Sequence, residues 1–274
     1  MLLDGKKLRD ELLVKYEKYI KENNLKIKLA IIEVGDNDAS KIYIKNKVKY
    51  CEAANITVDL YHLDEATTEY ELLSLIDKLN KDEDVTGIIL QSPIPKHLDF
   101  DKCSNKVLSS KDVDGFTKDN VYKLYLNRKC IMPCTVKGII KLLDFYKIPI
   151  EGAHAVIVGR GNIVGKPLAL ALENKNATVT LCHSKTKNLR EITKGADILI
   201  SATGVPNIIT KDMVNSNACL IDVGISKIDG KIVGDIDKEA YEVASYVTPN
   251  PGGVGPMTVA MIIDNLIEMK EGKW

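Results

Sequence analysis

The sequence predicts an α/β protein of two α/β lobes, the second built on a Rossmann-type parallel sheet, with an inter-lobe cleft. Three observations lead to this. Apolar strands alternate with amphipathic helices along almost the whole chain, a long polar segment interrupts them near residues 95–134, and a glycine-rich turn follows a strand in the second half. Such alternation indicates parallel strands covered by helices on both faces. A chain of 274 residues is long enough for two modest domains, each with its own core.

The first half of the chain is predicted to alternate between helix and strand. Apolar residues recur at helical spacing from Leu8 to Ile20, which predicts a helix over residues 8–21. We expect further helices at 40–54 and 69–79 and strands at 28–34, 57–63 and 85–90. Pro93 and Pro95 then end the pattern, and a single long loop is expected as far as Cys134. An unstructured loop of that length inside a compact protein usually has a function.

The second half of the chain repeats the alternation after a helix at 136–146. Strands are expected at 155–158, 178–182, 198–202 and 219–223, and a final helix at 259–269 follows a break at the proline- and glycine-rich residues 249–256. We therefore predict one domain over residues 1–147 and another over 148–257. The C-terminal helix, within residues 258–274, is expected to pack back on the first domain.

Composition and charge exclude several classes of protein. Lys and Arg equal Asp and Glu at 38 each, so no basic footprint indicates nucleic acid or an acidic membrane surface. Six scattered cysteines without a CxxC pair, and four histidines, do not favour a metal site or a disulfide framework. The charged N-terminus does not resemble a signal peptide, and no apolar run is long enough to span a bilayer. We expect a cytoplasmic protein that binds no metal.

The glycine-rich turn follows the strand at 155–158 and is the candidate dinucleotide site. Gly159-Arg160-Gly161 leads through Ile163 and Val164 to Gly165, where a helix is expected to begin. Glycines let the backbone approach a pyrophosphate, and the unpaired N–H groups of a helix N-terminus face the anion. The spacing is GxGxxxG rather than GxGxxG, so an ordinary strand-to-helix turn is the alternative.

The end of the next strand favours NADP over NAD. An NAD site usually carries a carboxylate there for the ribose hydroxyl, whereas this strand ends in His183, Ser184 and Lys185. A hydroxyl and a cation suit a 2′-phosphate, and Arg160 can reach the same region. The alternative is that Arg160 and Lys185 are solvated surface charges.

A second candidate site lies on the helix at 40–54. Ser40, Tyr43 and Lys47 fall at i, i+3 and i+7 and share one face. A lysine withdrawn from water beside a phenol can act as an acid or base. Gln91 at the carboxyl end of a strand can hold such an amine, and Asp114 in the long loop can bind a polar heterocycle. The alternatives are a helix cap for Ser40, a half-buried aromatic for Tyr43, a solvated stripe for Lys47 and an ordinary turn for Asp114.

At these residues the chain resembles the methylenetetrahydrofolate dehydrogenase/cyclohydrolase family. The matching segments follow the family's order over nearly the whole chain. They are Val34-Gly35 to Lys47, Gln91-Ser92-Pro93, Lys111 to Gly115, Pro133 to Thr135, Gly159 to Pro167, His183 to Thr186, Asp222 to Ile225 and Thr248 to Thr258. The run from Pro251 to Thr258, PGGVGPMT, is the most specific of them.

The resemblance implies oxidation of 5,10-methylenetetrahydrofolate with NADP⁺, followed by hydrolysis of the methenyl product to 10-formyltetrahydrofolate. It implies that Lys47 is the central acid/base of the hydrolytic step, that Tyr43 orients the folate and the lysine, and that Gln91 tunes the lysine amine. It also implies that Asp114 holds the pterin ring. Folate contacts are implied for Ser40, Leu90, Ser92, Pro251, Gly252, Gly253, Val254, Gly255 and Pro256. Cofactor contacts are implied for Gly159, Arg160, Gly161, Ile163, Val164, His183, Ser184 and Ile225. The resemblance also implies a homodimer.

Four positions depart from the family's common pattern. Gly161 replaces a serine that can touch phosphate, Ser92 replaces a leucine, Val136 a proline and Asn250 an apolar residue.

A short-chain dehydrogenase also combines a glycine-rich turn with Tyr-x-x-x-Lys, but there the turn precedes the pair, whereas here Tyr43 precedes Gly159. A monofunctional member and a catalytically silent folate or nucleotide sensor remain as further alternatives.

Overall fold

The computed structural model describes residues 1–228 and 230–274, and within them all side chains except those of residues 38 and 39. By contacts the chain divides into two compact units. The first unit comprises Asp10–Cys134 with Val259–Trp274, and the second comprises Met1–Arg9 with Thr135–Thr258. The predicted fold of two α/β lobes is confirmed. The division by contacts falls after residue 134, whereas the sequence placed the domain boundary after residue 147. The boundary between the folate-binding and NADP-binding domains at residue 147 stays a prediction.

The first unit is built on a three-stranded parallel sheet with the order β2-β1-β3. Its strands are β1 (Lys28–Val34), β2 (Thr57–Leu63) and β3 (Gly87–Leu90). The central strand, β1, pairs on both sides, and its sequence KLAIIEV is buried almost throughout. A strand buried on both faces is apolar at nearly every position instead of alternating.

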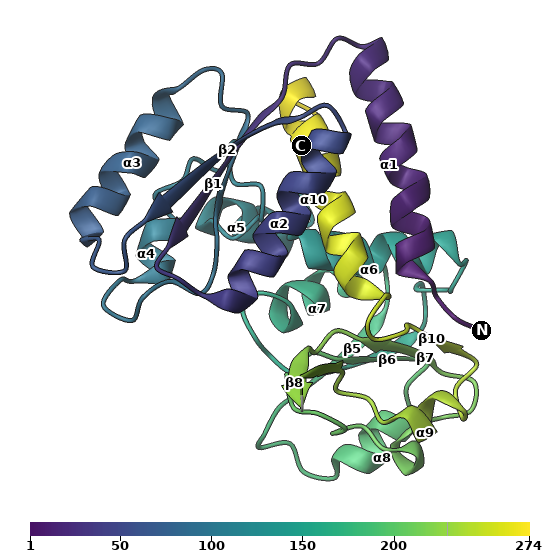
Figure 1. Cartoon of the computed structure of the whole chain (residues 1–274). Helices are drawn as coiled ribbons and strands as arrows, with labels where there is room; N and C mark the ends of the chain where they lie inside the picture. The colour runs from purple at the N-terminus through teal and green to yellow at the C-terminus, as the bar shows by residue number, and fades with distance from the viewer. Residues whose placement is uncertain (229) are drawn as a thin grey trace. The chain divides into compact units, whose positions relative to one another are not determined.

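Helices cover both faces of this sheet (Figure 1). On one face, α3 (Glu69–Lys81) and α4 (Phe100–Ser104) pack on Ala30, Ile32 and Ile88. On the other face, a Cβ built on Gly87 would meet the side chain of Leu266 from the C-terminal helix α10 (Val254–Glu271). The remaining helices are α1 (Gly5–Glu22), α2 (Asp38–Ala53) and α5 (Lys118–Tyr125).

The long loop predicted between residues 95 and 134 is wrong in part, because α4 and α5 lie within it. Both helices are short. In α4 the cap is a side chain, since the Asp99 carboxylate accepts from the Lys102 N–H. Such helices offer too few turns for an apolar period to stand out in the sequence.

The second unit contains a five-stranded, fully parallel sheet with the order β10-β7-β6-β4-β5. Its strands are β4 (His154–Val158), β5 (Thr178–Cys182), β6 (Ile198–Ser201), β7 (Cys219–Asp222) and β10 (Tyr246–Val247). The chain runs from β4 to β5 on one side and then returns to β6 on the other side of β4. The strand order therefore reverses between β4 and β6, and ligands bind such sheets at the carboxyl ends of the strands at that point.

Short elements complete the second unit. Its helices are α6 (Cys134–Phe145), α7 (Gly165–Glu173), α8 (Leu189–Lys194), the 3₁₀ turn η1 (Lys211–Met213) and α9 (Lys238–Tyr241). The antiparallel hairpin β8 (Ser226–Ile228) and β9 (Lys231–Val233) was not predicted. The final helix begins at Val254 instead of residue 259, since Pro256 lies in the first turn, where a missing N–H breaks no helical hydrogen bond.

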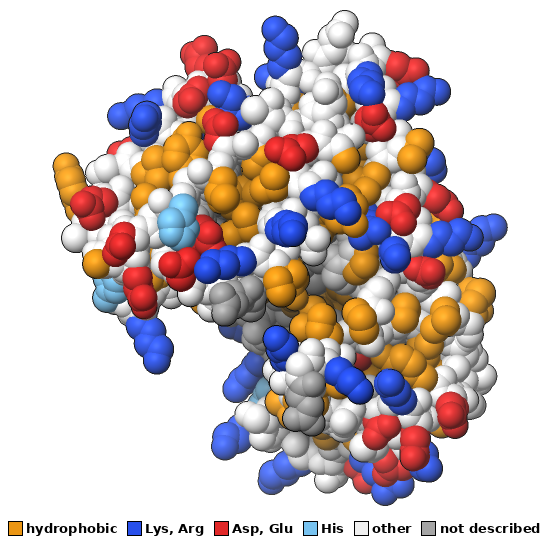
Figure 2. All heavy atoms as spheres, viewed as in Figure 1, with side chains coloured by type: hydrophobic (Ala, Val, Ile, Leu, Met, Phe, Trp, Pro, Cys, Tyr) orange, Lys and Arg blue, Asp and Glu red, His pale blue; other side chains and the backbone are white. Residues whose placement is uncertain are grey.

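No helix in the described part of the chain is long and apolar enough to cross a membrane. The described residues contain no disulfide and no group of three or more metal-binding side chains. Positive and negative side chains are interspersed over most of the face shown in Figure 2, in keeping with equal numbers of the two charges.

Candidate active site

Lys47 and Gln91 form a buried pair at the carboxyl end of the first unit's sheet. Lys47 and Gln91 are each only 9% exposed, and the Lys47 Nζ donates a hydrogen bond to Gln91 Oε1 at 3.0 Å. Gln91 directly follows β3, and its backbone N–H bonds the Ile32 carbonyl, which extends the sheet by one residue. Its Nε2 donates to the Ser92 carbonyl at 2.7 Å, so the amide oxygen is turned toward the lysine. The alternative of a solvated Lys47 is wrong, because the amine is withdrawn from water and held by a neutral acceptor.

Ser40 and Tyr43 lie on the same helix as Lys47. Asn37, not Ser40, caps α2, since the Asn37 Oδ1 accepts from the Ser40 N–H at 3.1 Å. Ser40 is 3% exposed, and its buried hydroxyl has no hydrogen-bond partner among the described residues. Tyr43 is 42% exposed, and burial of the rest of the ring raises the pKa of its phenol. The helix thus presents a buried unused hydroxyl and a partly open phenol in addition to the lysine.

Asp114 is brought to the same end of the sheet by a strand-like turn. Residues 111–113 run parallel to β3, where the Ile88 N–H donates to the Lys111 carbonyl at 2.7 Å and Ile88 pairs with Asp112. Continuing that register places Asp114 opposite Leu90, the last residue of β3 before Gln91. The turn ends at Gly115, which has a φ of +68°.

Two buried polar side chains hold this turn. The Asp112 carboxylate accepts from the Thr117 N–H and from Asn120 Nδ2, and burial raises the pKa of Asp112. Asn265 of α10 is fully buried and donates to the Val113 carbonyl at 2.9 Å. Sequence reasoning missed Asn265. Its signal is a single amide within the apolar run of the last helix, where an unpaired polar group would be costly.

The glycine-rich turn of the second unit lies where the strand order reverses. Gly159 has a φ of +115°, and a Cβ built on it would lie 2.3 Å from the Ala202 carbonyl oxygen at the end of β6. A Cβ on Gly165, the first residue of α7, would lie 2.1 Å from the Gly159 carbonyl oxygen. Around Gly161, by contrast, no atom of any described residue other than Gly161 and its two chain neighbours lies within 4 Å of the Cβ position. The backbone is therefore tightly packed on its protein side and open at Gly161, as a phosphate-binding turn requires.

The remaining predicted cofactor residues surround this turn in the second unit. Arg160 and Ile163 are exposed and Val164 is half-buried. At the end of β5 the His183 N–H donates to Thr186 Oγ1, and the tight turn leaves Ser184 exposed. Ile225 follows β7 and is 46% exposed.

The predicted folate loop is tied to the second unit by its backbone. The Gly252 carbonyl accepts from the Lys6 N–H at 2.9 Å, and the Gly253 N–H donates to the Pro249 carbonyl at 2.7 Å. Val254, Gly255 and Pro256 form the first turn of α10. The side chain of Leu90 is 6% exposed and packs in the core of the first unit, which leaves its backbone for any ligand contact. Ser92 is half-buried beside Gln91.

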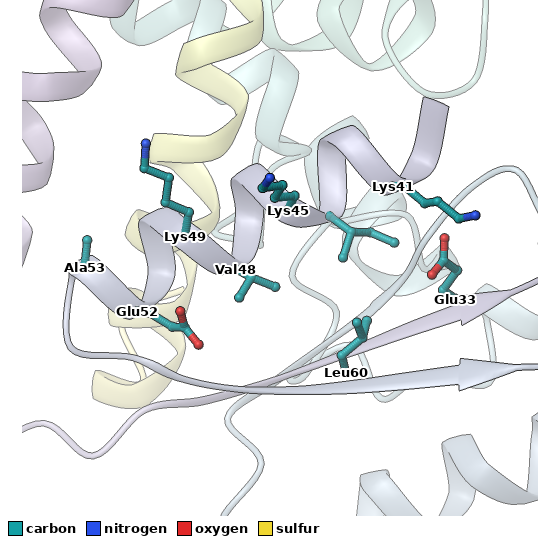
Figure 3. A pocket seen from close by; sticks show the side chains of 9 residues that line it. Glu33, Lys41, Lys45, Val48, Lys49, Glu52, Ala53 and Leu60 are labelled. Atoms are coloured by element: carbon teal, nitrogen blue, oxygen red, sulfur yellow. The ribbon is translucent and has the colours of Figure 1, made fainter. Parts of the chain in front are cut away.

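An open groove of about 640 Å³ runs along a different face of α2 (Figure 3). It is lined by Ile44, Val48 and Leu60 with Glu33 and Glu52, and by Lys41, Lys45, Lys49 and Ala53. None of the residues predicted from the sequence to bind folate or cofactor lines it. The candidate chemistry therefore lies on the other side of the helix, at Lys47.

Comparisons with known proteins match nearly the whole chain. A family model described as the tetrahydrofolate dehydrogenase/cyclohydrolase catalytic domain matches residues 3–114, and one described as the NAD(P)-binding domain of the same family matches residues 133–273. The bifunctional protein FolD of Clostridium novyi is 51% identical over 271 residues, which cover 97% of this chain and 98% of the relative.

Solved structures agree with this match. The bifunctional FolD of Campylobacter jejuni superimposes with a TM-score of 0.97 at 45% identity, covering 100% of this chain and 99% of the other. The Trypanosoma brucei methylenetetrahydrofolate dehydrogenase-cyclohydrolase, solved with NADP cofactor and inhibitor, gives a TM-score of 0.94 at 31% identity, covering 100% and 98%.

Proposed function

The chain belongs to the tetrahydrofolate dehydrogenase/cyclohydrolase family, and from that premise we propose that it catalyses both of the family's reactions. It oxidises 5,10-methylenetetrahydrofolate to the 5,10-methenyl cation with NADP⁺ and then hydrolyses that cation to 10-formyltetrahydrofolate. The observation that carries the proposal is the buried hydrogen bond between Lys47 and Gln91. Two relatives named bifunctional protein FolD are 51% and 45% identical to this chain over 97% and 98% of its length.

Lys47 moves the protons of the hydrolytic step. Water adds to the carbon between N5 and N10 and loses a proton. When the C–N5 bond breaks, N5 gains a proton and the hydroxyl of the adduct loses its own to become the formyl oxygen, so one proton is released overall. A buried amine that changes between neutral and protonated forms can take the first proton and return the second. Gln91 fits this role because its amide oxygen accepts from the amine without fixing its charge, as a carboxylate would.

The first unit also supplies groups that can hold the folate. The buried hydroxyl of Ser40 lacks a protein partner, and a buried polar group in a folded protein normally has one. Asp114, held opposite Leu90 by the strand-like turn, is assigned to the pterin, whose ring nitrogens and amino group are donors for a carboxylate. Tyr43 and the backbone of Ser92 are assigned to the remainder of the ligand. The backbone of residues 251–256, which belongs to the second unit, is also assigned to folate.

The second unit fits NADP by its backbone. Gly159 and Gly165 leave no room for a Cβ, and the open Gly161 position borders the N-terminus of α7. These N–H groups would hold the pyrophosphate, while Arg160 and Ser184 would hold the 2′-phosphate. NADP⁺ supplies the hydride acceptor of the oxidative step when bound. His183, Ile163, Val164 and Ile225 are assigned to its contacts.

A two-wavelength assay tests the proposal. Purified protein is given 5,10-methylenetetrahydrofolate and NADP⁺, and NADPH and the methenyl product are followed together. We expect NADPH to rise while the methenyl product is formed and consumed. NADPH with a permanently accumulating methenyl product would indicate a monofunctional dehydrogenase. Hydrolysis of added methenyltetrahydrofolate without NADPH formation would indicate a cyclohydrolase alone. The absence of both NADPH formation and methenyltetrahydrofolate hydrolysis would contradict both assignments.

The preference for NADP predicts the effect of removing Arg160. We expect Arg160→Ala to raise the KM for NADP⁺ about tenfold, the loss of one charge-assisted hydrogen bond, with little change for NAD⁺. Steady-state kinetics with both nucleotides measures this. Lys187→Ala removes an exposed cation beyond the 183–186 turn and serves as the control. An equal loss with NAD⁺ would remove Arg160 from 2′-phosphate recognition.

Homodimer formation and a cytoplasmic location complete the proposal. The homodimer rests on family membership and the location on the composition of the chain, and size-exclusion chromatography with light scattering tests the homodimer. A strictly monomeric mass at micromolar concentration would contradict it.

A further inference from the structure

Two buried carboxylates tie together three segments that follow strands of the second unit's sheet. The segments are 201–204, which begins at the last residue of β6, 223–225 after β7 and 248–250 after β10. The carboxylates belong to Asp222, the last residue of β7, and to Asp235, which lies between the β8–β9 hairpin and α9. Asp222 is 3% exposed and Asp235 is fully buried. The glycine-rich turn adjoins the first segment and Ile225 ends the second.

Asp235 holds the first segment. Its Oδ2 accepts from the Thr203 N–H at 2.7 Å, from the Thr203 hydroxyl at 2.8 Å and from the Ser201 hydroxyl at 2.9 Å. The Gly204 N–H approaches the same oxygen at 3.3 Å. One buried oxygen therefore fixes the turn that leaves β6. That turn is in contact with Gly159, whose missing Cβ would collide with Ala202.

Asp222 and Asn250 hold the other two segments. The Asp222 Oδ1 accepts from the Asp235 N–H at 2.9 Å, and its own N–H donates to Thr248 Oγ1 at 2.8 Å. Asn250 Nδ2 donates to the Gly224 carbonyl at 2.8 Å, and the Asn250 side chain also bonds the Asp222 carboxyl. Residues 224 and 250 are thereby linked directly, next to Ile225 on one side and the Pro251–Gly255 loop on the other.

Each aspartate also packs against a glycine close in sequence to the other aspartate, Asp235 against Gly224 and Asp222 against Gly234. A Cβ built on Gly224 would lie 1.8 Å from Asp235 Oδ1, and one built on Gly234 would lie 1.8 Å from Asp222 Oδ2. Asp235 Oδ1 has no hydrogen-bond partner among the described residues. The backbone at Gly224 thus rests directly on a carboxylate, and the two strand ends are locked to each other by packing as well as by hydrogen bonds.

We propose that Asp235, with Asp222 and Asn250, is a positioning residue of the dinucleotide site: it pre-orders the turn after β6 and the segment at Ile225 so that NADP binds without first organising them. This rests on the proposed function. Burying a carboxylate is unfavourable unless hydrogen-bond donors surround it. The donors around Asp235 belong to Ser201, the last residue of β6, and to Thr203 and Gly204 in the turn that follows, where the strand order of the sheet reverses. Pre-ordering matters because binding that must first order a loop is weakened by the lost conformational entropy.

Asp235→Asn tests this, because asparagine keeps the size of the side chain and removes its charge. We expect the dissociation constant for NADP⁺, measured by calorimetry, to rise about tenfold, roughly the entropy of ordering the backbone of one residue. The dehydrogenase kcat/KM for NADP⁺ should fall in parallel. Hydrolysis of added methenyltetrahydrofolate, which uses Lys47 and Gln91, should stay within about twofold of wild type.

Asp237→Asn is the matched control. Asp237 lies two residues along, and its carboxylate caps α9 by accepting from the Glu239 N–H at 2.9 Å. The control perturbs local stability in the same unit without touching the turn after β6. The NADP⁺ dissociation constant of Asp235→Asn is measured at a temperature well below the melting temperature of the variant. If the melting temperature falls but this dissociation constant equals that of wild type, Asp235 is structural only and the inference is wrong.

Asn250→Leu provides a second, independent variant, which removes the link between residues 224 and 250 and leaves Asp235 in place. We expect weaker NADP⁺ binding by a few-fold, with the 203–204 contacts intact. If wild-type protein forms no NADPH and binds no NADP⁺, the proposed function fails and not merely this inference. If wild type is active and both variants bind NADP⁺ normally, the inference alone fails.

Discussion

Lys47→Met is expected to abolish cyclohydrolase activity while folate is still bound. Methionine keeps most of the length and apolar character of the lysine stem, so the buried position beside Gln91 stays filled. What is lost is the group that takes and returns a proton, and such groups contribute about 10²–10⁴-fold to rate. We therefore expect hydrolysis of methenyltetrahydrofolate, followed by its absorbance, to fall by at least about 10²-fold.

The control for this variant is Lys45→Met, which changes an exposed lysine on the same helix. Folate affinity, measured by fluorescence titration, should remain within about threefold of wild type in both variants. Wild-type hydrolysis by Lys47→Met would show that another group moves the protons. Loss of folate binding together with hydrolysis would show instead that the amine mainly binds the ligand.

Gly159→Ala is expected to have the opposite effect, eliminating the dehydrogenase and sparing the cyclohydrolase. Alanine at this position would adopt a φ of +115°, which L side chains rarely tolerate, and its Cβ would lie 2.3 Å from the Ala202 carbonyl oxygen. Either the turn or the end of β6 must move, and both border the nucleotide site. We expect NADPH formation to fall by more than about 10²-fold, because small displacements of positioning groups have effects of that size.

Gly195→Ala is the matched control, since Gly195 has a φ of −84° and the nearest atom would lie 3.5 Å from the new Cβ. It should bind NADP⁺ as wild type does. Circular dichroism establishes that Gly159→Ala is folded, and hydrolysis of added methenyltetrahydrofolate is the internal check. Retained NADPH formation in a folded Gly159→Ala protein would exclude this turn as the pyrophosphate site.

Periodicity was sufficient to predict the regular part of the fold. The strands at 28–34, 57–63 and 178–182 have the predicted bounds, because each is a short run rich in β-branched, aliphatic or aromatic residues, which is typical of a strand. The short helices α4 and α5 and the hairpin β8–β9 were missed. Their stability comes from caps and tertiary contacts, such as the hydrogen bond from the buried Asn120 side chain to Asp112. Such contacts produce no hydrophobic periodicity in the sequence.

The candidate site shows the same division. Helical spacing placed Ser40, Tyr43 and Lys47 on one face, and the position of Gln91 after a strand brought it to the lysine. The spacing could not show that Asn37 takes the cap and leaves the Ser40 hydroxyl unused. Nor could it find Asp235 or Asn265, because the hydrogen-bond partners of these side chains lie 31 or more residues away in sequence and come together only in the folded chain.

The strand-like segment 111–113 does more than present Asp114. By bonding to Ile88 it covers the main-chain groups along the outer side of β3, and an uncovered strand edge is a template on which other molecules can add and aggregate. The folate contact proposed for Asp114 and the protection of this sheet edge thus depend on the same turn. A substitution that released it, at Asn265 or Gly115, would weaken folate binding and at the same time open a sheet edge to intermolecular pairing.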